Sequence, residues 1–169
     1  MRKYSDDQRK RSAEEKCEAD IQRYGLHVLK VAGDNEWPDF VYSIGLFHSF
    51  DHPEVIILGL PGGVAHDILN SLVDVLRSGK CFADGDETDD LLEGYSCRFL
   101  VVPPEQVVAH FGWAMWYYDG RAFPTLQLVY PDREGRWPWD AGVSPSFLAQ
   151  QPILNAVPVP AWATRSRYH

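Results

Sequence analysis

Two histidines and two carboxylates lie within seven consecutive residues, 48–54. Side chains of these types can bind a metal ion or transfer protons. His48 and His52 would face the same way only on a helix, whereas Pro53 favours a loop that leads into an apolar strand. We therefore interpret most of this stretch as polar groups that fix a turn. His52 and Glu54 bracket the entry to the strand, where a functional side chain would be well held.

The strand that precedes this turn offers space for a ligand. Ser43 and Gly45 share one face of a predicted strand, and such small residues leave room for another backbone or a bound molecule. A pocket at this place would have Tyr42, Ser43, His52 and Glu54 as its polar groups. One hypothesis is therefore a small-molecule enzyme or ligand-binding domain in which these four residues are the catalytic or binding groups.

Two further segments resemble binding loops only partly. Residues 59–63 are rich in glycine and precede a predicted helix, but they match neither the dinucleotide pattern nor the phosphate loop, so we interpret them as a tight turn. The acidic residues 84–93 would place Asp89 where a calcium loop needs glycine and Tyr95 where it needs glutamate. We expect this segment to be a solvated loop, and we expect neither a metal nor another cofactor.

Cysteine usage and charge narrow the function classes. Cys17, Cys81 and Cys97 are widely spaced, and none lies in a Cys-x-x-Cys pair, which favours free thiols in a reducing cytoplasm. We expect neither a signal peptide nor a membrane-spanning segment, because no apolar run follows the first basic residues and none reaches about 20 residues. The net charge is −8, and the excess of acid falls after residue 23. Such a body repels nucleic acid and attracts a basic protein.

The densest cluster of large side chains lies between residues 111 and 139. A Trp-Pro-Trp segment, Trp137 to Trp139, is stiff and loses little entropy on binding, and aromatic residues are frequent anchors in protein interfaces. The same cluster can instead form a rigid core. Both interpretations stay open for its members, which are Phe111, Trp113, Trp116, Tyr117, Tyr118, Phe123, Tyr130, Trp137 and Trp139.

The elements that must position these groups can be predicted from periodicity and from turn residues. Apolar residues at helical spacing indicate helices at 5–24, at 64–78 and from Pro104 to about Tyr118, the last interrupted at Gly112. Alternating or continuous apolar runs indicate strands at 26–31, 40–46, 54–60, 95–102 and 125–130.

Strands outnumber helices and do not alternate strictly with them, which predicts an α+β fold. We expect a mixed or mainly antiparallel sheet of about five strands packed with two or three helices. The predicted organisation is a charged N-terminal helix at 1–23, docked on the body or fraying from it, a single domain at 24–154 and an extended tail at 155–169.

Several motifs together resemble a known family. They are Phe40-x-Tyr42-Ser43-Ile44-Gly45-Leu46, His52-Pro53-Glu54, His110-Phe111-Gly112-Trp113-Ala114, Phe123-Pro124-x-x-Gln127-Leu128-Val129 and Pro131-Asp132-x-x-Gly135-x-Trp137-Pro138-Trp139. In combination, over residues 21–154, the chain is similar to the bacterial domain of unknown function 4262 family. The resemblance implies a single bacterial cytoplasmic domain and supplies no reaction.

The sequence favours a non-enzymatic protein-binding domain, of the kind found in immunity or antitoxin proteins that neutralise a basic toxin. The acidic body, the lack of a catalytic signature and the rigid aromatic residues support this hypothesis. A homo-oligomer that pairs its own aromatic surface is a further possibility. The expected anchors and charged groups of the binding surface are Trp137, Trp139, Tyr118, Asp132, Asp86 and Asp89.

Overall fold

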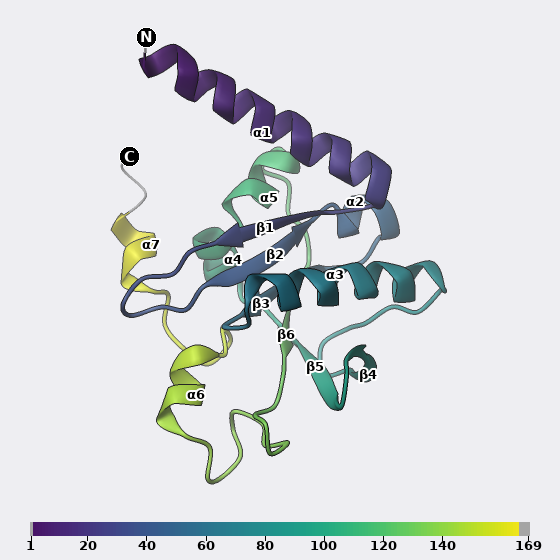
Figure 1. The fold of residues 1–169 in the computed structure, drawn as a ribbon, viewed down its shortest axis with the longest axis vertical. Helices are drawn as coiled ribbons and strands as arrows, with labels where there is room; N and C mark the ends of the chain where they lie inside the picture. The colour runs from purple at the N-terminus through teal and green to yellow at the C-terminus, as the bar shows by residue number, and fades with distance from the viewer. Residues whose placement is uncertain (1, 166–169) are drawn as a thin grey trace.

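The computed structural model describes residues 2–165. A mixed β-sheet lies at the centre, with helices on both of its faces (Figure 1). The helices are α1 (Arg2–Tyr24), α2 (Leu46–Phe50), α3 (Gly62–Arg77), α4 (Pro104–His110), α5 (Gly112–Tyr117), α6 (Pro145–Gln150) and α7 (Ala161–Arg165). The strands are β1 (His27–Val31), β2 (Phe40–Ile44), β3 (Glu54–Leu58), β4 (Glu87–Leu92), β5 (Tyr95–Val101) and β6 (Thr125–Val129).

The sheet has six strands in the order β1-β2-β3-β6-β5-β4. The central neighbours β3 and β6 run parallel, with Glu54 opposite Thr125, and every other pair is antiparallel. The predicted α+β class with a mixed sheet is confirmed. One end of the β3–β6 pair carries the loops that enter both strands, and the other end carries the loops that leave them.

Two apolar layers hold the sheet. Alternate residues of the central strands point to opposite faces. Val41, Val55 and Ile57 pack with the apolar stripe of α3. Phe40, Tyr42 and Ile56 belong to the layer beneath α1, α5 and the C-terminal segment. Because β2 and β3 are covered on both faces, all of their residues are buried.

Two local predictions are wrong. The acidic residues 84–93 are not entirely loop, because Glu87–Leu92 forms the edge strand β4. Only Thr88 and Leu91 of its six residues are buried, and they lie three positions apart. The strand therefore lacks the regular apolar alternation from which a strand is predicted. The predicted loop before Glu54 contains the short helix α2, which begins after Gly45, at φ 108°, and ends at Asp51.

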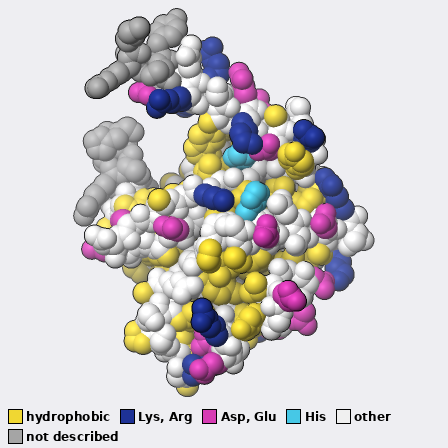
Figure 2. All heavy atoms as spheres, in the orientation of Figure 1, with side chains coloured by type: hydrophobic (Ala, Val, Ile, Leu, Met, Phe, Trp, Pro, Cys, Tyr) yellow, Lys and Arg dark blue, Asp and Glu magenta, His cyan; other side chains and the backbone are white. Residues whose placement is uncertain are grey.

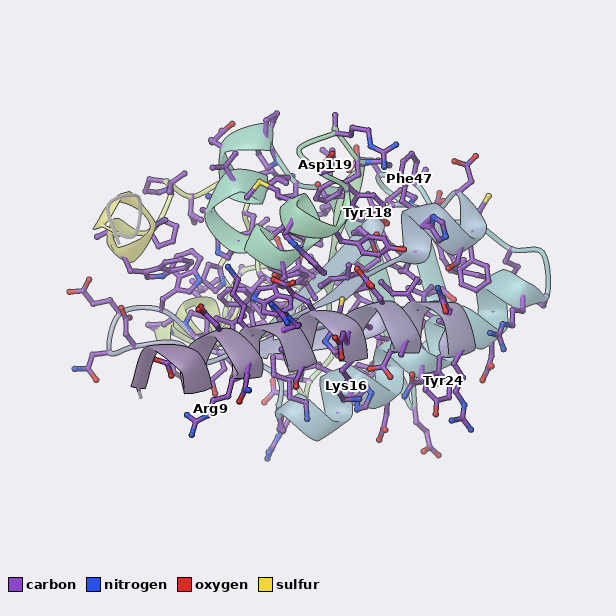
Figure 3. All side chains as sticks on the ribbon, turned by 90° about the horizontal axis from the view of Figure 1, so that it is seen from above. Arg9, Lys16, Tyr24, Phe47, Tyr118 and Asp119 are labelled. Carbon is purple, nitrogen blue, oxygen red and sulfur yellow. The ribbon has the colours of Figure 1, made fainter. Side chains whose placement is uncertain are left out.

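Helix α1 is longer than predicted, and from Asp6 onward it is attached to the body only at its C-terminal part. Twenty-three residues give a helix about 35 Å long. Cys17 and Ile21 are buried, whereas from Asp6 to Lys16 no side chain is buried. Figure 3 shows the helix lying along one side of the body, with Arg9, Lys16 and Tyr24 spaced along its length.

The chain after Trp139 is anchored to β6 by two buried glutamines. The side-chain amide of Gln151 accepts from the Tyr130 amide at 3.0 Å and donates to the Tyr130 carbonyl at 2.8 Å. The Gln127 amide donates to the Pro152 carbonyl at 2.8 Å and accepts from the Leu154 amide at 2.9 Å. This segment also forms α6 and α7, and residues 166–169 of the predicted tail lie outside the described residues.

Candidate functional site

Glu54 is the one carboxylate among the described residues that is completely buried. Its Oε1 accepts hydrogen bonds from Ser43 Oγ at 2.8 Å and from the Leu46 amide at 3.1 Å. Its Oε2 accepts from the Gly45 amide at 3.0 Å, from the Phe47 amide at 3.3 Å and from the Tyr118 hydroxyl. All five partners are donors, which is the pattern that an ionised carboxylate requires.

Two opposing influences act on the Glu54 carboxyl. Burial raises its pKa above the ordinary value, because a charge is costly in an apolar interior. The hydrogen bonds from Tyr118 and Ser43 and from the backbone favour the charged form and oppose that rise. The pKa of Tyr118 is also raised, first by burial and then by the neighbouring carboxylate, so this hydroxyl is a proton donor in a hydrogen bond and not an acid.

The Glu54 network joins four elements that are distant in the sequence. Ser43 is in β2, the backbone donors begin α2, Glu54 begins β3 and Tyr118 follows α5. Ser43 Oγ also accepts from the Val55 amide at 2.9 Å, and the Tyr118 hydroxyl accepts from the His48 amide at 3.2 Å. Since the acceptor positions are occupied and the group is buried, we interpret Glu54 as an internal anchor that holds the sheet end together.

Phe47 and Tyr118 cover this anchor. Their rings meet edge to face with centroids 5.9 Å apart, and the two side chains lie next to each other in Figure 3. Tyr118 retains 5% of its accessible surface. Tyr118 is therefore part of the interior and is not exposed for contact with a partner.

His52 lies near Glu54 but belongs to a separate set of contacts. Its Nδ1 is 2.8 Å from the Pro53 carbonyl, and its Nε2 accepts from the Phe82 amide at 3.1 Å. This pattern assigns the proton to Nδ1 and requires a neutral ring. Burial lowers the pKa of His52, which agrees with that assignment. Its two ring nitrogens are thus occupied by backbone groups.

Tyr42 faces the opposite layer from Ser43. Its hydroxyl accepts from the Trp113 amide at 3.0 Å, and its ring packs against Phe111 with centroids 4.8 Å apart. Burial raises its pKa. The structure therefore brings Ser43 and Glu54 together, and it places Tyr42 and His52 in two other environments. All four side chains are buried.

The aromatic cluster divides between core and surface. Phe111, Tyr118 and Tyr130 are buried, and Trp113, Tyr117, Phe123 and Trp137 are half-buried. Trp116 and Trp139 are exposed, with Trp139 retaining 47% of its accessible surface. The rings of Trp137 and Trp139 are stacked 5.5 Å apart at an angle of 5°.

The stacked indoles lie beside Arg98 of β5, which in turn contacts the acidic edge strand β4. The Arg98 guanidinium carbon is 5.3 Å from the Trp137 centroid and 5.2 Å from the Trp139 centroid. Arg98 also forms an ion pair with Glu87 of the edge strand. On the same strand Asp89 accepts a hydrogen bond from Ser96 Oγ. Trp137, Trp139, Arg98, Glu87 and Asp89 are called the indole ridge below.

The two remaining acids of the predicted surface have local structural roles. Asp86 is exposed and accepts from the Ala83 amide at 2.8 Å. Asp132 accepts from the amides of Glu134 and Arg136 and forms an ion pair with the Arg136 side chain at 3.0 Å. These hydrogen bonds lower the pKa of Asp132. Asp132 therefore shapes the loop that leads to the indole ridge.

A large groove lies at the end of the sheet where β3 and β6 begin. Its volume is about 890 Å³, and it is lined mainly by apolar side chains. Val101 and Val108 in its wall are about half exposed. Asp51, Asp84 and Arg121 are charged residues of its lining. We call this feature the apolar groove.

The fold and these contacts define a class of protein, an α+β domain whose mixed sheet is held at one end by a buried, fully hydrogen-bonded carboxylate. The family model for a domain of unknown function (DUF4262) matches residues 20–144, and the chain belongs to this family. No curated protein and no solved structure matches the chain. Within residues 2–165, no helix has the length and apolar character needed to span a membrane.

Sequence reasoning missed two partners. Tyr118 reaches Glu54 from 64 residues away, and no local pattern indicates that contact. Arg98 could have been found, because a lone basic residue in an alternating strand opposite an acidic segment suggests a cross-strand pair. No group of three or more metal-binding side chains occurs among residues 2–165.

Proposed function

We propose that this protein is a non-enzymatic binding domain that captures a basic protein, with the indole ridge and the apolar groove as its contact surface. A toxin with a cationic surface, neutralised as immunity or antitoxin proteins do, is the partner type that we favour. The observation that carries the proposal is the Trp137–Trp139 stack, with Trp139 exposed, beside an edge strand that bears Glu87, Asp89 and Asp90.

The ridge and the groove meet along β5, so a partner that reaches around the end of this strand would contact both. Arg98 belongs to the ridge, and Val101 lines the groove three positions later, about 10 Å along the strand and with its side chain on the opposite face. The acidic segment runs from Asp84 at the groove to Glu87 at the ridge. Apolar anchors surrounded by charge are the usual composition of an interface centre and its rim.

Charge supports a basic partner. The chain has 24 acidic and 16 basic side chains. Asp86 is exposed between the groove and the ridge and Asp89 is exposed on the ridge, while the exposed Asp90 beyond it forms an ion pair with Lys80. Complementary charge mainly increases the association rate, and salt weakens that effect. The proposal therefore requires an association rate that falls as ionic strength rises.

The chemistry of the polar groups gives less support to an enzyme. The Glu54 carboxylate accepts five hydrogen bonds, and both nitrogens of His52 are engaged by backbone groups. A general base needs a free lone pair within reach of a substrate proton. Neither side chain offers one in this arrangement.

The test is capture from the native host followed by direct binding measurements with the purified partner. Replacing Trp137 and Trp139 together by alanine should weaken binding by at least about 2 kcal/mol, or roughly thirtyfold in Kd. Trp116→Ala is the matched control, since it removes another exposed indole, one that lies on α5.

Three results would contradict the proposal. They are a captured partner that is acidic, a double variant that binds as tightly as the wild type, and a Trp116→Ala variant that loses equal affinity. Light scattering on the purified chain tests self-association, because a stable homodimer that is lost in the double variant would assign the ridge to a second copy.

A further inference from the structure

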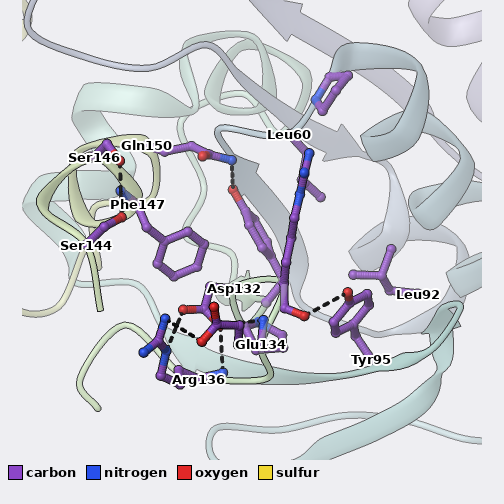
Figure 4. Close-up of a pocket in the computed structure, with 14 residues that line it drawn as sticks. Leu60, Leu92, Tyr95, Asp132, Glu134, Arg136, Ser144, Ser146, Phe147 and Gln150 are labelled. Atoms are coloured by element: carbon purple, nitrogen blue, oxygen red, sulfur yellow. Dashed lines mark hydrogen bonds and ion pairs between the residues drawn. The ribbon is translucent and has the colours of Figure 1, made fainter. Parts of the chain in front are cut away.

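A second concave site lies at the opposite end of the sheet from the apolar groove. Its volume is about 690 Å³, within the usual range for small-molecule sites. Leu60 and Pro61 follow β3, and Tyr130 and Pro131 follow β6, so the site lies beyond the carboxyl ends of the two parallel strands. Ligand crevices in sheets with parallel strands are commonly found at this position. We call this site the carboxyl-end crevice (Figure 4).

The floor of the crevice is apolar. The Phe147 ring of α6 points into the space in Figure 4, opposite Leu92. Phe147 packs edge to face on Tyr130 with centroids 6.0 Å apart. Figure 2 shows hydrophobic side chains gathered between α3 and the lower part of the body, next to basic and acidic groups. An aromatic or branched aliphatic group would bury apolar area on this floor.

The charges of the crevice are not equally available. Arg136 forms ion pairs with Asp132 at 3.0 Å and with Glu134 at 2.9 Å, so these three side chains neutralise one another in part. Among the described residues, the Arg133 side chain has neither an ion pair nor a hydrogen bond, and it lines the same space. A guanidinium in this position can bind a planar anion through two parallel hydrogen bonds.

The backbone that carries Arg133 is fixed. The Tyr95 hydroxyl donates to the Arg133 carbonyl at 3.2 Å, and the preceding Asp132 holds the turn through the amides of Glu134 and Arg136. The opposite wall is also fixed, because Gln150 Nε2 donates to the Gly59 carbonyl at 3.0 Å. The two walls of the crevice are therefore formed before any ligand arrives, which limits the entropic cost of binding.

We propose that the carboxyl-end crevice binds a small monocarboxylate, with its carboxylate on Arg133 and an aromatic or branched aliphatic body on Phe147. The four charged side chains of the lining, Asp132, Arg133, Glu134 and Arg136, sum to zero. A monocarboxylate that pairs with the free guanidinium therefore leaves the occupied site with a net charge of −1, whereas a phosphate dianion would leave −2 beside the same two acids. No residue named in this lining belongs to the indole ridge or to the apolar groove, although Asp132 also shapes the loop that leads to the ridge.

The experiment is an NMR titration of the ¹⁵N-labelled full chain with 3-phenylpropionate and with its uncharged amide, 3-phenylpropionamide. We expect the carboxylate to bind with a Kd on the order of 1 mM or lower and to shift amides of residues 130–136 and 144–150. The amide should bind at least about tenfold more weakly, because it lacks the charge-assisted pair with Arg133.

Arg133→Gln should remove the difference between the two probes, and Arg23→Gln, an exposed arginine on α1, should not. The chemical-shift dispersion of the variant's ¹H–¹⁵N spectrum reports directly whether Arg133→Gln is folded. Equal binding of carboxylate and amide, shifts confined to other regions or an unaffected Arg133→Gln variant would overturn the proposal. So would tighter binding of phenyl phosphate, or the absence of shifts with 3-phenylpropionate, indole-3-acetate and 4-methylpentanoate at about 10 mM each.

Discussion

Replacing Glu54 by glutamine tests whether the buried carboxylate is the anchor of the sheet end. Glutamine keeps the shape of the side chain but exchanges one acceptor oxygen for an NH₂ donor. In the better orientation its carbonyl keeps the three donors now on Oε2, namely Gly45, Phe47 and Tyr118. The NH₂ group then faces the donors now on Oε1, which come from Ser43 and Leu46.

The expected loss follows from these contacts. Two hydrogen bonds to a charged group are removed, each contributing about 1.5–3 kcal/mol, and the Leu46 backbone amide is left without its acceptor. The free energy of unfolding should therefore fall by about 3–5 kcal/mol. That is a large part of the total stability of a domain of this size, which is about 5–15 kcal/mol.

The assay is urea unfolding at pH 7, followed by tryptophan fluorescence and by circular dichroism. Glu36→Gln makes the same chemical change on an exposed side chain and should alter stability by less than about 0.5 kcal/mol. If Glu54→Gln is as stable as the wild type, the carboxyl is already protonated in the folded protein. The interpretation of five donors around an ionised group would then be refuted.

Three further predictions follow from other contacts. Burial lowers the pKa of His52 and His110 in the folded state, so the unfolded chain binds protons first and the free energy of unfolding should fall from pH 7 to pH 5. His52→Gln should reduce that fall, as measured by urea unfolding at each pH. An unchanged dependence of stability on pH would contradict the assignment of a neutral His52. A thiol-reactive dye should label only Cys81 in the native protein and all three cysteines in urea. The reason is that Cys17 and Cys97 are buried, which raises the pKa of each thiol to about 12. Fast labelling of Cys17 in the native protein would show that α1 detaches. Ile21→Ala should cost about 2–4 kcal/mol of stability, whereas removing residues 1–12 should cost less than about 0.5 kcal/mol, and a large effect of the truncation would reveal contacts along the free part of α1.

Periodicity predicted most of the fold because most elements carry a clear apolar pattern. The continuous run after Glu54 and the stripe of α3 led directly to the central strand and to the helix that covers it. Gly112 correctly marked the break between α4 and α5. The edge strand β4 was missed because two of its six residues are buried and the rest are polar or half-buried.

The polar groups of the site could be selected from the sequence, but their environments could not. Ser43 and Glu54 were placed together, and they do share a hydrogen bond. The hydrogen bonds that fill the acceptor positions of Glu54 come from two tertiary features. One is the left-handed turn at Gly45, which begins α2, and the other is the contact with the Tyr118 hydroxyl. The sequence likewise could not predict that the Arg133 side chain lacks an ion pair among the described residues, because this depends on Arg136 pairing with both Asp132 and Glu134.

The glutamine pairs on β6 have a consequence for how the chain can be shortened. Gln127 and Gln151 exchange hydrogen bonds with backbone groups on the other segment, so each segment completes the interior of the other. A stop codon placed before Gln151 would remove all four of these hydrogen bonds and leave the Gln127 side chain and the Tyr130 backbone groups without these partners in an apolar interior. Expression plasmids for this domain should therefore extend beyond the boundary of the family match, and affinity tags belong after the second glutamine.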